Sequence, residues 1–221
     1  IDKSSHSIPT KAMVEEAFEK YFTPTNIPGI AVAIIKNDRI VYRKVYGFAN
    51  IAQQTHVTMN TPFNVASISK TILGTAIMQK VEQGEISLTD KLTEMNLSFD
   101  PNNPLNPNDG ITLRQLVTHT SGIRDNKGYV CTHFVHGSGV SLSQLFGDEN
   151  CPENATTNAT TFFADDYFNE NGRYVMDGVY GEGEEGLPGM AFKYSNVATG
   201  LAGYAVEQKL NIDFADSMKE S

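Results

Sequence analysis

The hydrophobic positions along the chain predict a helix, a β-hairpin and then a longer, mostly helical section. Residues 11–22 (KAMVEEAFEKYF) carry apolar side chains every three or four positions, which is the period of an amphipathic helix. Residues 30–36 (IAVAIIK) form a short apolar run rich in β-branched side chains, and residues 40–49 alternate between apolar and polar side chains. Residues 37–39 (NDR) lie between these two segments, so we expect a turn that pairs them as a hairpin.

Three later segments have the pattern of helices. Residues 71–83 place apolar side chains on one helical face, and Gly84 suits the left-handed residue that ends such a helix. Residues 111–122 (ITLRQLVTHTSG) predict a second helix with Thr112 as its N-cap. Residues 195–210 are rich in small apolar side chains, which indicates a buried helix packed closely against its neighbours.

The remaining segments leave the predicted sheet incomplete. Residues 124–190 contain many Gly, Asn, Asp and Thr residues and predict loops with short helices. Two strands alone do not form a stable sheet in water. Either the chain has more strands than the pattern reveals, or partner strands come from elsewhere.

The composition limits the class of protein. The 221 residues are 40% hydrophobic and 19% charged, which suits a packed core rather than disorder. The net charge is −9 and no Lys/Arg cluster occurs, which argues against a nucleic-acid binder. No apolar run approaches the ~20 residues of a membrane-spanning helix. The polar start has Ile in place of Met, so we expect a mature periplasmic or secreted chain without its signal peptide.

The two cysteines and two of the histidines are the residues to consider for a disulfide or a metal site. Cys131 and Cys151 belong to no CxxC pair, so they predict either one disulfide in an oxidising compartment or two free thiols, and not a zinc site. His133 and His136 have a spacing that could bind a metal on a helix, but the adjacent Gly137 favours a loop. We therefore expect no metal site, and the serine chemistry considered below would use no cofactor.

The stretch FNVASISKTILG, residues 63–74, contains the strongest candidate chemistry. Ser67 and Lys70 are three residues apart, so on a helix their side chains are neighbours. The backbone N–H of Ser67 and the positive helix end could stabilise an oxyanion. Burial and the same field would disfavour the ammonium form of Lys70, which could then accept the serine proton. The alternative is structural: Ser67 or Ser69 caps the helix and Lys70 is solvated.

Four segments in the same order resemble the serine β-lactamase and penicillin-binding-protein superfamily. The resemblance is strongest to its branch of class C β-lactamases, D-alanyl-D-alanine carboxypeptidases and esterases. Residues 63–92 resemble its nucleophile helix, and residues 111–123 resemble a later family segment containing HTSG. Residues 187–208 resemble the segment with its Tyr-x-Asn motif, and residues 27–50 its opening hairpin. The resemblance covers most of the chain and is poorest over residues 124–180.

The resemblance assigns roles to specific residues. It implies that Ser67 is the nucleophile, that Lys70 and Tyr194 share the proton transfers, and that Asn196 binds Lys70 and the substrate amide. A second Tyr-x-Asn, residues 167–169, lies in a polar context unlike that of the family motif. His119 could be read as the base of a Ser-His pair, but in the family HTSG forms a structural turn.

The chain departs from the family pattern in one respect. The third family motif, Lys-Thr-Gly or His-x-Gly on a strand that walls the site, does not occur in the sequence. We therefore expect an α+β, β-lactamase/transpeptidase-like fold, an antiparallel sheet flanked by helices plus a mostly helical domain, whose C-terminal strands are missing here. The expected divisions are residues 1–60 (helix and hairpin), 61–195 (mostly helical) and 196–221 (a helix leading into the rest of the α/β domain).

These observations lead to one function and one alternative. The leading interpretation is a serine hydrolase that acts through an acyl-enzyme on a D-Ala-D-Ala peptide, a β-lactam or a small ester. A missing C-terminal segment or second chain would complete its sheet as a partner. The alternative is a catalytically impaired module that recognises penicillin or senses peptidoglycan, which the absent third motif favours. A purely structural helical domain with chance motifs would not explain four ordered matches.

Overall fold

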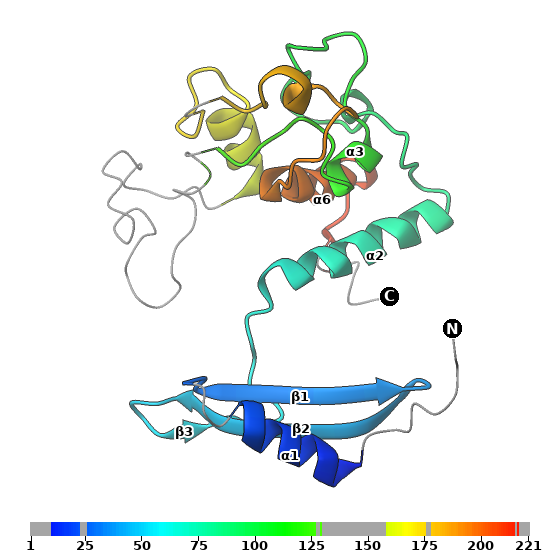
Figure 1. The fold of residues 1–221 in the computed structure, drawn as a ribbon. Coiled ribbons are helices and arrows are strands. Elements are labelled where there is room, and N and C mark those ends of the chain that lie inside the picture. The colour runs from blue at the N-terminus through cyan, green and yellow to red at the C-terminus, as the bar shows by residue number, and fades with distance from the viewer. Residues whose placement is uncertain are drawn as a thin grey trace. The chain divides into compact units, whose positions relative to one another are not determined.

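The computed structural model describes residues 10–22, 26–126, 129, 158–175, 178–214 and 216. The chain forms two compact units, Ile1–Val65 and Ala66–Ser221 (Figure 1). The first contains the predicted helix and hairpin, and the second contains the later helices. Cys131, Cys151, His133 and His136 lie outside the described residues, so the disulfide and the histidine pair stay untested.

The first unit is a small antiparallel sheet with a helix on one face. Strands β1 (Gly29–Lys36), β2 (Arg39–Asn50) and β3 (Thr55–His56) lie in the order β1-β2-β3. Asn37 and Asp38 join β1 to β2 with φ angles of 52° and 59°. Two positive φ angles define the tight turn that matches the twist of a hairpin. The predicted hairpin is confirmed, and the short third strand was not predicted.

Helix α1 (Lys11–Tyr21) packs on this sheet as its amphipathic pattern predicts. Its N-cap Thr10 accepts a hydrogen bond from the backbone N–H of Met13 at 3.3 Å. The rings of Phe18 and Tyr46 stack with centroids 4.9 Å apart, and Glu15 pairs with Lys44 at 2.7 Å. The helix therefore contacts the sheet through both apolar and charged side chains.

The second unit is mostly helical. The α-helices among its described residues are α2 (Ser69–Glu82), α3 (Leu113–Val117) and α6 (Asn196–Leu210). Short 3₁₀ turns occur at Ala66–Ile68 (η1), Leu92–Glu94 (η2) and Gly183–Gly186 (η4), and Thr161–Tyr167 (η3) is a π-helix. The three helices predicted at 71–83, 111–122 and 195–210 are all present, although α3 is shorter than predicted.

Helix α6 is the centre of the core of this unit. Its small side chains let it lie against its neighbours on several sides, and Leu201, Ala202 and Ala205 are fully buried. A Cβ at Gly203 would lie 3.1 Å from Leu73 of α2, so the two helices approach closely at this glycine. The burial expected from the composition of this segment is confirmed.

A glycine fixes the turn that follows α3. Gly122 has a φ of +80°, which L side chains rarely adopt, and a Cβ there would lie 2.2 Å from the carbonyl oxygen of Gly186. Glycine is required on both counts. Next to it, Ile123 forms a β-bridge with Tyr180, so the segment after α3 is tied to the segment that leads to α6.

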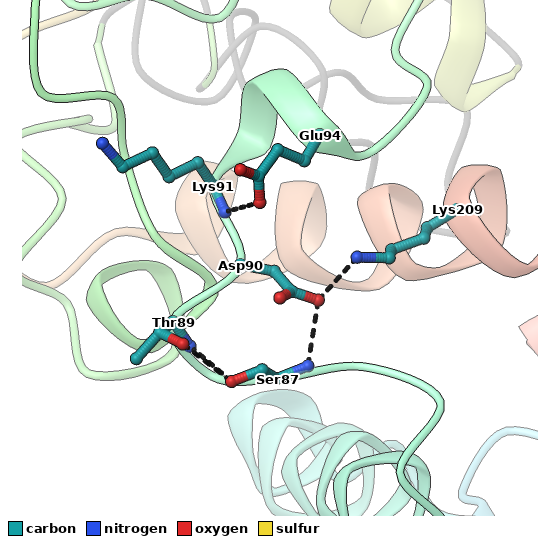
Figure 2. Close-up of polar contacts among 6 residues, drawn as sticks. All are labelled: Ser87, Thr89, Asp90, Lys91, Glu94 and Lys209. Atoms are coloured by element: carbon teal, nitrogen blue, oxygen red, sulfur yellow. Dashed lines mark hydrogen bonds and ion pairs between the residues drawn. The ribbon is translucent and has the colours of Figure 1, made fainter.

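An ion pair joins the other end of α6 to the segment after α2. Figure 2 shows Lys209 pointing at the carboxylate of Asp90, and the two groups are 2.6 Å apart. The same carboxylate oxygen accepts the backbone N–H of Ser87 at 2.9 Å (Figure 2). Burial raises the pKa of Asp90, but the hydrogen bonds from Lys209 and Ser87 outweigh it, so the pKa lies below its usual value.

Candidate active site

Ser67 lies in a 3₁₀ turn directly before helix α2. The turn spans Ala66–Ile68, and α2 begins at Ser69, with Ile68 as an N-cap that makes no side-chain cap bond. The structural alternative, in which Ser67 or Ser69 caps the helix, is therefore wrong. Ala66 has a φ of +45°, a strained conformation for a residue with a Cβ. Such strain is concentrated at functional sites and here it directly precedes the candidate nucleophile.

Side chains from two distant parts of the sequence meet around Ser67. The hydroxyl of Tyr194 lies 2.8 Å from Ser67 Oγ, and Lys70 Nζ donates to the same Oγ at 3.1 Å. Lys70 Nζ also donates to Asn196 Oδ1 at 2.5 Å. The residues predicted from the sequence thus form one continuous hydrogen-bonded chain, from Tyr194 through Ser67 and Lys70 to Asn196.

Tyr194 lies partly exposed beside Lys70. The residue is 44% exposed, and Lys70 Nζ lies 5.1 Å from the centre of its ring. The nearby Lys70 ammonium, followed by the hydrogen bond to Ser67, lowers the pKa of the Tyr194 hydroxyl from its ordinary value. A tyrosine with a lowered pKa is a better proton acceptor near neutral pH.

The second Tyr-x-Asn sequence is not at this site. Tyr167 is fully buried in the core and its hydroxyl donates to the backbone carbonyl of Arg124. Burial raises the pKa of this hydroxyl far above its ordinary value. Tyr167 is a structural tyrosine, which leaves Tyr194 as the tyrosine beside Ser67.

His119 supports the loop that carries Tyr194. Its Nδ1 accepts the backbone N–H of Ser195 at 3.2 Å, and its ring lies 4.5 Å from the ring of Tyr194. Burial, and then the charge of Lys70, lower the pKa of the imidazole. Because His119 Nδ1 already accepts the hydrogen bond from the loop, the contact supports a structural role for the HTSG turn.

Asp125 is the residue at this site that sequence reasoning missed. Its carboxylate accepts from the backbone N–H groups of Asn196 and Val197, at 3.0 and 2.9 Å, and from the side-chain amide of Asn196 at 2.6 Å. It also accepts from the hydroxyl of Ser195 at 3.2 Å. The only sequence signal was an acidic residue just after HTSG, and no spacing rule relates it to a helix start seventy-one residues later.

Within the described residues, no group of three or more His, Cys, Asp or Glu side chains could hold a metal ion. The groups within hydrogen-bond distance of the Ser67 hydroxyl are the phenol of Tyr194 and the amine of Lys70. These groups can activate a nucleophile and move its proton to a leaving group.

No described helix is long and apolar enough to cross a membrane.

Comparison with known proteins identifies the family. The model of the family described as Beta-lactamase matches residues 14–221, so the chain belongs to this family, whose members are serine hydrolases. Protein flp of Staphylococcus aureus (strain N315) is 27% identical over 114 residues, which are 52% of this chain and 23% of flp. A protein named Beta-lactamase from Escherichia coli (strain K12) is 38% identical over 96 residues, 43% of this chain and 24% of the relative.

Solved structures agree on the fold. The octameric penicillin-binding protein homologue from Pyrococcus abyssi superposes with a TM-score of 0.67 at 22% identity, covering 95% of this chain and 41% of the homologue. EstCE1, a hydrolase with promiscuous acyltransferase activity, has a TM-score of 0.61 at 18% identity, covering 94% of this chain and 49% of EstCE1. The fold is thus β-lactamase/transpeptidase-like, as predicted, with a small part of the antiparallel sheet. The matched part of the chain covers less than half of each of these four proteins.

Proposed function

We propose that the protein is a serine hydrolase that cleaves an amide or ester bond through an acyl-enzyme on Ser67. The observation that carries this proposal is the contact of Ser67 Oγ with both the Tyr194 hydroxyl at 2.8 Å and Lys70 Nζ at 3.1 Å. A serine that only caps a helix needs neither neighbour. Membership of the Beta-lactamase family supports the same reaction class.

In the proposed acylation step, Tyr194 acts as the base. Lys70 is the donor in its contacts with Ser67 and Asn196, and it lowers the pKa of Tyr194. Tyr194 in its phenolate form takes the Oγ proton while Oγ bonds to the substrate carbonyl carbon. The tetrahedral intermediate collapses when the carbon–nitrogen or carbon–oxygen bond breaks and the leaving group takes the proton from Tyr194.

Deacylation repeats the same proton path with water. Tyr194 takes a proton from a water molecule, the hydroxide attacks the acyl carbon, and Ser67 Oγ leaves with that proton. Lys70, whose Nζ donates to Ser67 Oγ, is placed to stabilise the negative charge that alternates between the phenolate and the serine oxygen. Asn196 Oδ1 accepts a hydrogen bond from Lys70, and we expect Asn196 also to bind the amide of a substrate.

The oxyanion that forms in both steps requires backbone donors. The N–H of Ser67, in the turn before α2, is the donor that this chain would supply. The second donor would come from the strand that carries the absent third motif. We propose that a segment or chain beyond these residues supplies that strand as a partner and completes the sheet. Removing one oxyanion donor typically costs ~10²–10³ in rate, so the full-length protein should be far more active than this chain.

The substrates that we propose are D-Ala-D-Ala peptides, β-lactams and small esters. A site facing peptidoglycan or extracellular esters would fit the proposed periplasmic or secreted location. A catalytically impaired module that binds penicillin or senses peptidoglycan is the second candidate, since Lys-Thr-Gly and His-x-Gly do not occur in the sequence. An acyl adduct that forms and then persists would favour this second function.

The proposal is tested by steady-state hydrolysis in the full-length protein. We expect it to hydrolyse p-nitrophenyl butyrate or a chromogenic cephalosporin, and Ser67→Ala to abolish the reaction. Ser69→Ala is the matched control, because it removes a neighbouring hydroxyl at the start of α2 and should leave the rate within about twofold. Equal rates for Ser67→Ala and the wild type would refute the proposal.

A further inference from the structure

Asp125 contacts both the start of helix α6 and a side chain of the candidate active site. Its half-buried carboxylate receives hydrogen bonds from Ser195, Asn196 and Val197, all at the start of α6. One of these bonds differs from the others because its donor is a side chain of the site, the amide of Asn196. The remaining bonds would stabilise the start of α6 in any protein, whatever its function.

The Asn196 amide bridges two charged groups. Its Nδ2 donates to Asp125 Oδ2 at 2.6 Å, and its Oδ1 accepts from Lys70 Nζ at 2.5 Å. An ionised carboxylate can only accept hydrogen bonds and an ammonium can only donate them. The reversed amide would point an oxygen at the carboxylate and an NH₂ group at the ammonium. Asp125 therefore determines which end of the amide meets Lys70.

The orientation of the amide in turn locates the lysine. Lys70 Nζ lies between Asn196 Oδ1 and Ser67 Oγ, and its side chain is flexible enough to leave this position if the acceptor is lost. We infer that Asp125 is a positioning residue of the reaction: it fixes the Asn196 amide so that the amide oxygen holds the Lys70 ammonium at Ser67. This inference rests on the function proposed for Ser67.

The test separates positioning from helix capping by a double-mutant cycle in the full-length protein. The measured quantity is the rate of acylation by a fluorescent penicillin and by p-nitrophenyl butyrate, per folded molecule. We expect Asp125→Asn to lower this rate by roughly 10- to 100-fold, since small displacements of catalytic groups have effects of this size. In an Asn196→Ala background the same substitution should change the rate by less than about threefold, because the amide through which Asp125 acts is gone.

Ser195→Ala is the matched control for capping. It removes the N-cap hydroxyl that accepts from Ala198 and one hydrogen bond to Asp125, but it leaves the Asn196 amide in place. We expect it to lower the melting temperature while the acylation rate per folded molecule stays within about twofold. If Asp125→Asn does not fold, Asp125→Glu takes its place in the cycle, because it keeps the charge and displaces the carboxylate.

The outcomes distinguish the inference from the function on which it rests. Suppose that the wild type is acylated and Ser67→Ala is not, and that the Asp125 substitution lowers the rate equally in both backgrounds. This result would overturn the inference and leave the proposed function intact. An Asp125 variant as active as the wild type would do the same. If neither probe labels the wild type, the proposed function fails, and the inference fails with it.

Discussion

The ion pair between Lys209 and Asp90 offers a stability prediction that does not depend on function. Lys209→Met removes the ammonium from the last turn of α6 and keeps most of the apolar stem of the side chain. Of the residues that the structure describes, Ser87 would remain as the hydrogen-bond donor to the Asp90 carboxylate, through its backbone N–H (Figure 2). We expect the substitution to destabilise the protein by about 1.5 kcal/mol.

This magnitude follows from the partial burial of the pair. Hydrogen bonds to charged groups contribute about 1.5–3 kcal/mol, and exposed ion pairs about 0.2–1 kcal/mol. The side chains of Lys209 and Asp90 are 25% and 19% exposed, and their contact distance is 2.6 Å, so the pair lies between these cases. For a protein of this size, about 1.5 kcal/mol corresponds to a fall of roughly 3–6 °C in melting temperature.

The pH dependence of this difference has a definite sign. The hydrogen bonds from Lys209 and Ser87 hold the pKa of Asp90 below its ordinary value in spite of burial, which raises it. The stability that this carboxylate contributes is thus fully present above the unfolded-state pKa of about 4. It is lost as the pH falls through the lower pKa of the folded state. The melting difference between wild type and Lys209→Met should be constant from about pH 6 to 8 and should shrink below about pH 4.

Thermal melting followed by circular dichroism measures the effect, with Lys91→Met as the matched control. Lys91 pairs with Asp109 at 3.6 Å, and these side chains are 40% and 78% exposed, so the loss should be within about 1 °C. Equal losses for the two variants would refute the reasoning that burial distinguishes the pairs. A difference for Lys209→Met that grows on acidification would contradict the assigned sign of the pKa shift.

Three further substitutions test the site and the fold. Tyr194→Phe should lower the acylation rate by about 10²–10⁴, because it removes the hydroxyl beside Ser67. The melting temperature should not change, because the residue is 44% exposed. The wild-type acylation rate should rise with pH as Tyr194 ionises, with a pKa below the usual ~10. If the rate of Tyr194→Phe rises over the same pH range, Tyr194 is not the base. Gly122→Ala should destabilise by more than about 2 kcal/mol, because the residue has a φ of +80° and contacts the Gly186 carbonyl. Gly74→Ala, with no described atom within 4 Å of its Cβ, should be neutral or stabilising in the same melting assay.

The apolar and polar patterns of the sequence predicted most helices and strands, because each of these elements depends on a short stretch of sequence. The hairpin was predicted from apolar runs around the turn residues 37–39, and in the structure two of these residues have positive φ angles. The cap of α3 was predicted at Thr112, whose side chain accepts from the Gln115 N–H. The predicted helix stop at Gly84 has the expected left-handed conformation, with a φ of +74°. The strand β3 was missed because two residues are too few to show a period.

The candidate site was predicted only in part, for a physical reason. Ser67, Lys70, Tyr194 and Asn196 belong to recognisable motifs, and the structure brings them into contact. Asp125 acts through hydrogen bonds to a helix end distant in sequence, which neither composition nor spacing reveals. The divisions expected at residues 60 and 195 remain predictions, as do the secreted location and the partner strand.

The most direct test of the proposed chemistry is the intact mass of the full-length protein before and after incubation with a penicillin, followed by peptide mapping. We expect a stoichiometric, penicillin-sized increase located on the peptide that contains Ser67, absent from Ser67→Ala and retained in Ser69→Ala. An adduct on another residue, or one that persists in Ser67→Ala, would contradict the assignment of Ser67 as the nucleophile.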